Sequence, residues 1–141
     1  MRFKQIDHTA DIGITAYGRD IKELFENSAF GMFSILTDLS KLEPSEKMTV
    51  KVRGIDYENL LVNWLNYLVY LVNTKIIVFR EFTVKELSGS KDQYSLNAEV
   101  KGEKLDPRKH KLNFEIKSAT YHNLKIAKYS GGYRVNIIFD I

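Results

Sequence analysis

The change in hydrophobic period near Ile76 constrains the fold of this chain more than any other feature. Before it, apolar residues recur at helical spacing in two stretches; after it, they alternate with polar residues as far as the last residue. Alternation is typical of strands with one buried face. Because runs of one element type favour α+β folds, the sequence predicts two helices packed on a mostly antiparallel β-sheet.

The predicted order is strand, helix, strand, helix and then a run of strands. Asp20 and Asp56 are the expected N-caps of the helices, and Glu23 would complete a capping box with Asp20. The second helix is apolar over much of its circumference, so it should be central, with Trp64 as a core anchor. Turns are expected at residues 88–90 and 131–132. The predicted strands cover residues 12–17, 47–53, 78–84, 94–100, 112–116, 124–126 and 133–139.

Composition and length limit the class of protein. Residues 1–141 are enough for a single domain with a real core, and a net charge of +3 permits contact with RNA or an acidic protein without arguing for either. The chain has no cysteine, which excludes disulfides, thiolate metal sites and cysteine nucleophiles. Residues 1–5 lack the apolar run of a signal peptide, and the apolar stretch 60–72 is too short to span a bilayer. We therefore expect a cytoplasmic protein that does not bind a membrane.

Polar groups are densest at residues 7–13, Asp-His-Thr-Ala-Asp-Ile-Gly, directly before a predicted strand. They form either a hydrogen-bonded turn, in which Asp7 caps backbone amides, or a functional loop in which Asp11 offers its carboxylate to a metal ion or a partner. Asp7 and His8 could also be an acid/base pair, although a structural hydrogen bond explains the same two residues.

The end of the chain carries a second group of acids. Asp140 follows an apolar strand, and Ile141 adds the terminal carboxylate. If this strand lies beside the first one, Asp11, Asp140 and the Ile141 carboxylate converge, and such groups repel one another unless they are protonated or bridged by a cation. Oxygen ligands select a hard ion such as Ca²⁺ or Mg²⁺. The alternative is a solvated, frayed terminus.

Other polar residues have simpler interpretations. His110 lies in the sequence Arg-Lys-His-Lys, which indicates a solvated loop or a contact patch for phosphate or an acidic partner. Lys117 lies next to Ile116 in a predicted strand, and by alternation it is an ordinary surface lysine. The sequence has no glycine-rich phosphate loop and no metalloprotease, dithiol or serine-hydrolase motif, so no motif points to a self-sufficient enzyme.

Four segments together resemble the archease family, in order and over essentially the whole chain. They are residues 7–13, residues 60–65 (Leu-Leu-Val-Asn-Trp-Leu), residues 115–122 (Glu-Ile-Lys-Ser-Ala-Thr-Tyr-His) and residues 138–141 (Ile-Phe-Asp-Ile). The first and third are specific motifs, whereas the second alone would be a weak one. The resemblance implies a small α+β protein in which residues 1–141 form one archease domain.

The resemblance also implies a function. Archeases assist the GTP-dependent tRNA-splicing RNA ligase: they speed formation of its covalent guanylate intermediate, allow it to turn over and broaden the nucleotides it accepts. They have no established reaction of their own, so this chain would be a protein cofactor and not an enzyme. The implied partners are the ligase and, through the ligase complex, tRNA.

The resemblance further implies a set of site residues. Family members bind a metal ion, taken to be calcium, through positions that correspond to Asp11, Asp140 and Ile141; magnesium and manganese are alternatives. Lys117 matches a functional lysine of the family, and Asp7 and His8 belong to the same N-terminal motif. One position departs from the pattern: Tyr67 stands where the family often has an acidic residue, which puts any role of that helix position in doubt.

Two rival functions remain at this point. The first is a binding module that acts as a chaperone for RNA-modifying enzymes such as a tRNA methyltransferase, which would need exposed apolar surface and not the acids. The second is a free-standing metal-dependent hydrolase, which would turn over a phosphoester without a partner.

Overall fold

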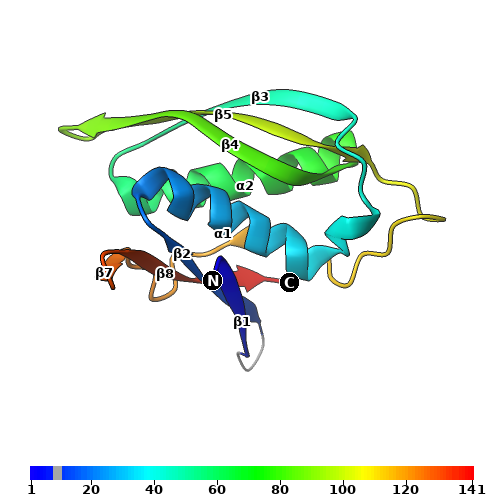
Figure 1. The fold of residues 1–141 in the computed structure, drawn as a ribbon, viewed down its shortest axis with the longest axis horizontal. Coiled ribbons are helices and arrows are strands. Elements are labelled where there is room, and N and C mark those ends of the chain that lie inside the picture. The colour runs from blue at the N-terminus through cyan, green and yellow to red at the C-terminus, as the bar shows by residue number, and fades with distance from the viewer. Residues whose placement is uncertain (8–10) are drawn as a thin grey trace.

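The computed structural model describes residues 1–7 and 11–141, and it places two helices between two antiparallel β-sheets (Figure 1). The helices are α1 (Ile21–Leu36) and α2 (Tyr57–Lys75), and a 3-10 turn, η1 (Leu39–Lys41), follows α1. The predicted α+β class, with two helices and antiparallel pairing, is confirmed. The strands are divided between two sheets with the helices as the middle layer.

The five-stranded sheet has the order β1-β2-β8-β6, and β7 also pairs with β8. Its members are β1 (Phe3–Asp7), β2 (Ile12–Gly18), β6 (Ser118–Ala119), β7 (Ala127–Tyr129) and β8 (Gly132–Asp140). The three-stranded sheet has the order β3-β5-β4, formed by β3 (Glu46–Gly54), β4 (Ile77–Ser90) and β5 (Gln93–Lys104). Each sheet packs one face on the helices, so each also has an outer face.

Both predicted helix N-caps are confirmed. The Asp20 carboxylate accepts a hydrogen bond from the Glu23 amide at 2.8 Å, and the Asp56 carboxylate accepts one from the Asn59 amide at 2.7 Å. The capping box differs from the prediction by one residue, since the Glu23 carboxylate accepts from the Arg19 amide at 3.0 Å. The Arg19 guanidinium also binds Glu23, which draws that carboxylate outward.

Trp64 is the predicted core anchor and is fully buried. Its indole Nε1 donates a hydrogen bond to the Phe25 carbonyl at 3.0 Å, which ties α2 to α1 across the middle layer. On the other side of the layer, Phe33 of α1 contacts Phe79 and Phe82 of β4, with ring centroids 5.7 and 5.5 Å apart. The apolar side chains of both sheets therefore share one core with the helices.

Strand β1 was not predicted from the sequence. It pairs with β2 from Phe3↔Ala16 to Asp7↔Ile12, and Phe3 packs against Phe30 of α1 with ring centroids 6.2 Å apart. The segment is short, and its side chains at Lys4 and Gln5 are exposed. It is extended because β2 offers an unpaired edge, which is a tertiary condition that alternation cannot reveal.

The predicted strand at residues 112–116 is wrong, because these residues form no strand. Their backbone is held by the end of α1 instead of a neighbouring strand. The Asn113 amide donates to the Leu36 carbonyl at 2.8 Å, and the Thr37 hydroxyl donates to the Lys111 carbonyl at 2.7 Å. The apolar side chains in this segment therefore pack beside the helices, although the segment pairs with no neighbouring strand.

Two strand ends also differ from the prediction. The turn between β4 and β5 lies at Lys91 and Asp92, whose φ angles are 48° and 67°, and β4 continues through the predicted turn at residues 88–90. Two successive left-handed residues suit the right-handed twist of a hairpin. The predicted strand at 124–126 lies instead at β7, where residues 127–129 pair with β8. The turn that joins β7 to β8 lies at Ser130 and Gly131, whose φ angles are 46° and 80°, one residue before the predicted turn at 131–132, because Gly132 begins β8.

Candidate functional site

Strand pairing brings the two ends of the chain together. In the β2–β8 ladder Ile12 lies opposite Phe139, so Asp11 and Asp140 come one position beyond the same pair. On the other side of β8, Ser118 of β6 lies opposite Asp140. The Lys117 amide donates to the Asp140 carbonyl at 2.8 Å. The sequence motifs around Asp11, Lys117 and Asp140 thus meet at one end of the five-stranded sheet.

These residues lie where a partner can reach them. Asp140 and Lys117 are exposed, Asp11 is half-buried, and Ile141 is 37% exposed. The residues before them are buried: Phe139 is fully covered, Ile116 is 5% exposed and Ile12, next to Asp11, is 6% exposed. The polar residues at this rim of the sheet therefore directly follow or precede buried residues, and the packing of those neighbours fixes the backbone of the polar residues.

The edge of this site is held by an asparagine, Asn66, whose role was not predicted from the sequence. Asn66 of α2 binds Ala119 of β6 with both ends of its amide: its Oδ1 accepts from the Ala119 amide at 2.7 Å, and its Nδ2 donates to the Ala119 carbonyl at 3.2 Å. The side chain thus pairs with the free edge of β6 as a further strand would. Since Lys117 is two residues away, Asn66 positions the lysine's segment.

A signal for this role exists in the sequence. Asn59, Asn63 and Asn66 recur at spacings of four and three, which places them along one side of a helix whose central part is otherwise largely apolar. All three bind groups outside their own turn. Asn63 donates to the Arg53 carbonyl at 2.8 Å, and Asn59 donates to the Tyr121 hydroxyl. A row of amides beside an apolar stripe indicates contacts with the backbone of neighbouring segments.

Two of the predicted residues fall on or beside the gap in the described chain. His8 lies outside the described residues, and for Asp7 only the backbone is described, as the last residue of β1 opposite Ile12. The choice between a turn and a functional loop at residues 7–13, and the predicted role of Asp7 and His8, stay predictions.

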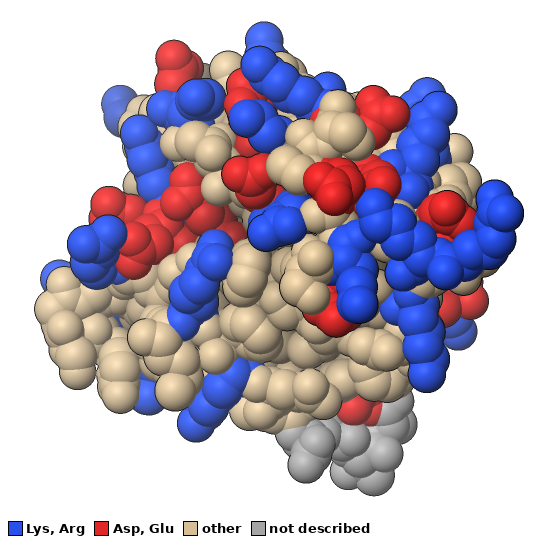
Figure 2. Space-filling view, turned by 45° about the vertical axis from the view of Figure 1, so that its right-hand side comes forward, with Lys and Arg blue, Asp and Glu red and all other residues tan. Residues whose placement is uncertain are grey.

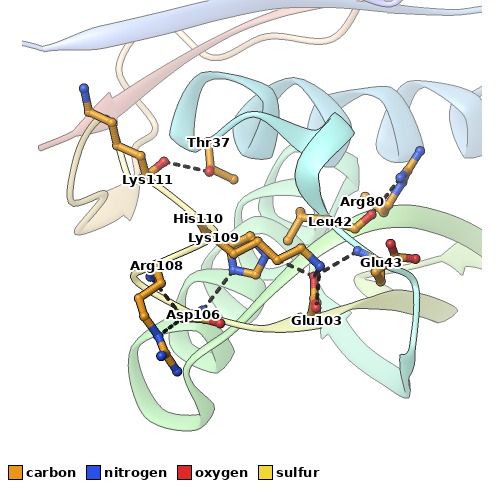
Figure 3. Close-up of polar contacts among 10 residues, drawn as sticks. All are labelled: Thr37, Leu42, Glu43, Arg80, Glu103, Asp106, Arg108, Lys109, His110 and Lys111. Carbon is orange, nitrogen blue, oxygen red and sulfur yellow. Dashed lines mark hydrogen bonds and ion pairs between the residues drawn. The ribbon is translucent and has the colours of Figure 1, made fainter.

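His110 corrects an expectation. Its neighbours suggested a solvated loop, but the ring is buried, with 4% of the residue exposed. The Asp106 amide donates to its Nδ1 at 2.9 Å, so Nε2 carries the hydrogen and donates to a Glu103 oxygen 3.0 Å away. Figure 3 shows the ring between Asp106 and Glu103. It is therefore a structural residue and not a contact patch.

Glu103 is the centre of that polar cluster (Figure 3). Its carboxylate accepts from the Glu43 amide at 3.0 Å, from the Lys109 ammonium at 3.0 and 3.1 Å and from His110. The Glu43 amide, then Lys109 and His110, lower the pKa of Glu103 from 4.5 to about 2. These hydrogen bonds fix the first part of the segment at residues 105–117, and Lys117 is the last residue of that segment.

The described residues include no group of three or more His, Asp or Glu side chains that could hold a metal ion. The predicted set has a different make-up: two aspartate side chains and the carboxylate of Ile141. All of these donors are oxygen atoms, which suits a hard ion that keeps part of its water shell.

Among the described residues no helix is long and apolar enough to cross a membrane.

Comparison with known proteins agrees with the motifs. The model of the Archease protein family matches residues 3–141. The chain belongs to the archease family. Named archeases from Sulfurisphaera tokodaii and Pyrococcus abyssi are 42% and 41% identical to it, each over 99% of both chains.

Two solved structures have a similar fold. The solution structure of protein 1598 from Methanobacterium thermoautotrophicum superposes with a TM-score of 0.86 at 33% identity, and it covers 99% of each chain. An archease from Thermotoga maritima, described in its title as a possible chaperone, superposes with a TM-score of 0.60 at 20% identity over 96% of this chain and 94% of that one. At 20% identity, the likeness to the Thermotoga maritima protein supports the fold alone.

Tyr67 of α2 lies on the surface beside another tyrosine. The Tyr67 ring stacks on Tyr70, one turn further along α2, with centroids 5.8 Å apart, and the two residues are 38% and 55% exposed. Tyr67 therefore offers an exposed aromatic surface, next in sequence to Asn66. Its side chain brings no carboxylate to the site.

Proposed function

We propose that this chain activates the GTP-dependent tRNA-splicing RNA ligase, as a protein cofactor without a reaction of its own. It promotes guanylylation and multiple turnover of the ligase and broadens its use of nucleotides. Membership of the archease family supports this function. The observation that carries it to particular residues is the β2–β8–β6 ladder, since one rigid rim holds Asp11, Asp140 and Lys117 together.

The working site in this proposal is a metal-binding acid cluster. Asp11, Asp140 and the carboxylate of Ile141 would hold a divalent ion, with calcium as the first candidate and magnesium or manganese as alternatives. The ion, when bound, supplies positive charge that offsets the charge of phosphate groups. The protein's part is to keep the three carboxylates close on a well-packed strand end, where their mutual repulsion favours a cation.

Lys117 supplies a second positive charge at the same rim. Its backbone is fixed from two sides, by the Asp140 carbonyl and, two residues on, by Asn66 at Ala119. Its exposed ammonium group can therefore be offered to a phosphate of the ligase's nucleotide or RNA end from a fixed backbone position. Nucleotidyl transfer builds charge on phosphoryl oxygens, and preorganised cations stabilise that charge.

The test is multiple-turnover ligation of RNA by the splicing ligase of the same organism, with and without the chain. A single-turnover assay of ligase guanylylation accompanies it. Asp140→Asn keeps the shape of the side chain and removes its charge. Asp92→Asn is the matched control, because Asp92 is an exposed aspartate at the β4–β5 turn of the other sheet. We expect the wild type and Asp92→Asn to activate the ligase and Asp140→Asn to fail in both assays.

Each part of the proposal can be overturned separately. Normal activation by Asp140→Asn would refute the acid cluster, and the absence of any effect of the wild-type chain would refute the activator function. Calorimetric titration of calcium into the chain alone tests the metal without the ligase, and Asp140→Asn should weaken the binding. Phosphoester turnover by the chain and metal without ligase would favour the hydrolase alternative.

The second candidate is the chaperone for RNA-modifying enzymes. The observation in its favour is the exposed pair Tyr67 and Tyr70, because a chaperone needs apolar surface on its outside. It predicts that Asp140→Asn still suppresses aggregation of a tRNA methyltransferase, whereas Tyr67→Ser with Tyr70→Ser does not. The opposite pattern would support the ligase activator.

A further inference from the structure

A row of aromatic and cationic side chains crosses the outer face of the five-stranded sheet at the end opposite the acid cluster. Tyr17 of β2 lies opposite Arg134 of β8, and Arg134 lies opposite Ala127 of β7. Their neighbours Ala16 and Val135 are buried, at 0% and 1% exposed, so they face the helices. Alternation therefore directs Tyr17 and Arg134 away from the helices.

Tyr129 completes this row. Its ring lies 5.5 Å from the Tyr17 ring at an interplanar angle of 45°, and the Arg134 guanidinium carbon lies 4.8 Å from its centroid. Despite both contacts the residue remains 45% exposed. Tyr129 pairs with Gly132, which has no side chain to cover the ring. We call Tyr17, Tyr129 and Arg134 the aromatic row.

The aromatic row borders an open hollow of about 460 Å³. Its walls include Tyr17, Tyr129, the ion pair between Arg19 and Glu23, and the β7–β8 turn, where Gly131 has a φ of 80°. The volume falls within the range of small-molecule sites, about 300–1,000 Å³. A flat ring can therefore enter beside the tyrosines.

We propose that the aromatic row binds single-stranded nucleic acid, with bases stacked on Tyr17 and Tyr129 and phosphates bound by Arg134 and Lys4. Tyr17 and Tyr129 lie on β2 and β7, the two strands that flank β8 at this end of the sheet. An open antiparallel sheet with aromatic rings on one face and helices on the other is an arrangement that stacks bases of single strands. Stacking on such rings tolerates every base, because each has a π-face. The site does not depend on the ligase function proposed above.

Charge favours a nucleic acid over a protein as the occupant. In the β1–β2–β8 register, Lys4, Thr15 and Asn136 form the row next to Tyr17 and Arg134. These five positions include two cations and no carboxylate, and Glu23, which lines the hollow, is paired with Arg19 at 2.9 Å. Thr15 also donates a hydrogen bond to Asn136 at 2.7 Å, so a polar row separates the aromatic row from the apolar side chains of Ile6 and Ile138 further along the sheet.

The aromatic row and the acid cluster are separate sites on one sheet. Arg134 and Asp140 both lie on β8, and the stretch of strand between them corresponds to about 20 Å at the usual rise per residue. Among the described residues no helix or strand lies across this outer face (Figure 1). Figure 2 shows charged side chains crowded over the upper part of the molecule, near the three-stranded sheet, and sparser over the lower part.

The test is fluorescence anisotropy with a labelled oligonucleotide of about 12 residues, the length of the larger single-strand sites. Oligouridylate, oligothymidylate and an RNA duplex are titrated with the full chain at low and at physiological salt. We expect saturable binding of the single strands and weak binding of the duplex. Tighter binding of oligouridylate would identify RNA as the ligand, and equal binding of both strands would identify single strands in general.

Variants assign the binding to the aromatic row. Tyr129→Ala should weaken binding about tenfold, the scale of one lost stacking contact, and Tyr129→Phe should retain it. Arg134→Ala should weaken binding and reduce its salt dependence. Tyr70→Ala is the matched control, since it removes an exposed tyrosine ring from α2 and should leave the affinity unchanged.

Three results would overturn the proposal. The first is the absence of saturable binding by the wild type at low salt. The second is equal affinity of Tyr129→Ala and the wild type, and the third is an equal loss in Tyr70→Ala. A Tyr129→Ala variant that binds oligonucleotides normally but no longer binds the ligase would assign the row to a protein partner. Asp140→Asn should bind oligonucleotides at least as well as the wild type, even if the ligase function is wrong.

Discussion

The two sheets of this protein share one core but have different outer faces. On the three-stranded sheet, cations and acids are interspersed: Lys47 pairs with Glu99 at 3.3 Å, and Lys101 approaches the same carboxylate at 3.9 Å. On the five-stranded sheet, the charged residues gather at the two ends: Asp11, Asp140 and Lys117 lie at one end, and the aromatic row with Arg134 lies at the other. Charge spread evenly over a face keeps it solvated, whereas charge gathered at one place can attract a charged ligand.

The edges of the sheets differ in a similar way. The short strand β6 has its free edge covered by Asn66, and this contact holds the segment that carries Lys117. On the three-stranded sheet, the outer strand β3 carries exposed lysines on its outward positions, which discourages pairing with another chain. The contact with Asn66 fixes the segment of a proposed site residue, whereas the lysines of β3 protect the edge of the sheet.

The largest effect on stability should come from loss of the edge contact at β6. Asn66→Leu removes both bonds to Ala119 and leaves a backbone amide without a partner, which costs about 1–3 kcal/mol. Because the segment before Ala119 carries Lys117, ligase activation should fall as well. Chemical denaturation and the ligation assay measure the two effects. Asn73→Leu, at an exposed position on the same helix, is the control, and an equal loss in both variants would contradict the positioning role.

A smaller, pH-dependent effect is expected at the end of the three-stranded sheet. The folded protein holds the pKa of Glu103 at about 2, below its ordinary value of 4.5, so the folded state favours the ionised carboxylate. This stabilisation is present above the unfolded pKa and is lost as the pH falls from about 4.5 towards 2. Glu103→Gln should lower the melting temperature at neutral pH.

The comparison that isolates this effect is between pH values. The difference in melting temperature between the wild type and Glu103→Gln should shrink as the solution is acidified through that window. A difference that stays constant from neutral pH down to the acid limit would show that the charge of Glu103 contributes nothing to stability. Activation of the ligase at neutral pH should change less than in Asn66→Leu, because Lys117 is at the far end of the segment.

The last comparison removes one lysine from each sheet and should have the smallest effect on stability. Lys51→Ala on β3 and Lys117→Ala beside β6 each remove one exposed ammonium group, and each should change stability by less than about 0.5 kcal/mol. Only Lys117→Ala should reduce ligase activation in the ligation assay. Equal activity of the two variants would mean that the rim of the five-stranded sheet is no more functional than the face of the other sheet.

Much of the fold could be predicted from residue patterns. The N-caps at Asp20 and Asp56, the buried Trp64 and the alternating strands follow from local chemistry, because a short side chain can satisfy a helix end and a period of two buries one face. The errors lie where tertiary contacts replaced a local rule. β1 is extended because β2 offers an edge, and residues 112–116 form no ladder because the end of α1 binds their backbone.

The candidate site was predicted in its residue types and motifs, but not in its support. The sequence by itself determined that Asp11 and Asp140 flank apolar strands and that the chain resembles the archease family, because these are properties of neighbouring residues. Only the tertiary structure decided that the two aspartates meet Lys117 at one rim, that Asn66 covers β6 and that Tyr17, Tyr129 and Arg134 form one row. Most of those contacts join residues far apart in the chain, and register between distant strands is set by the packing of the whole core.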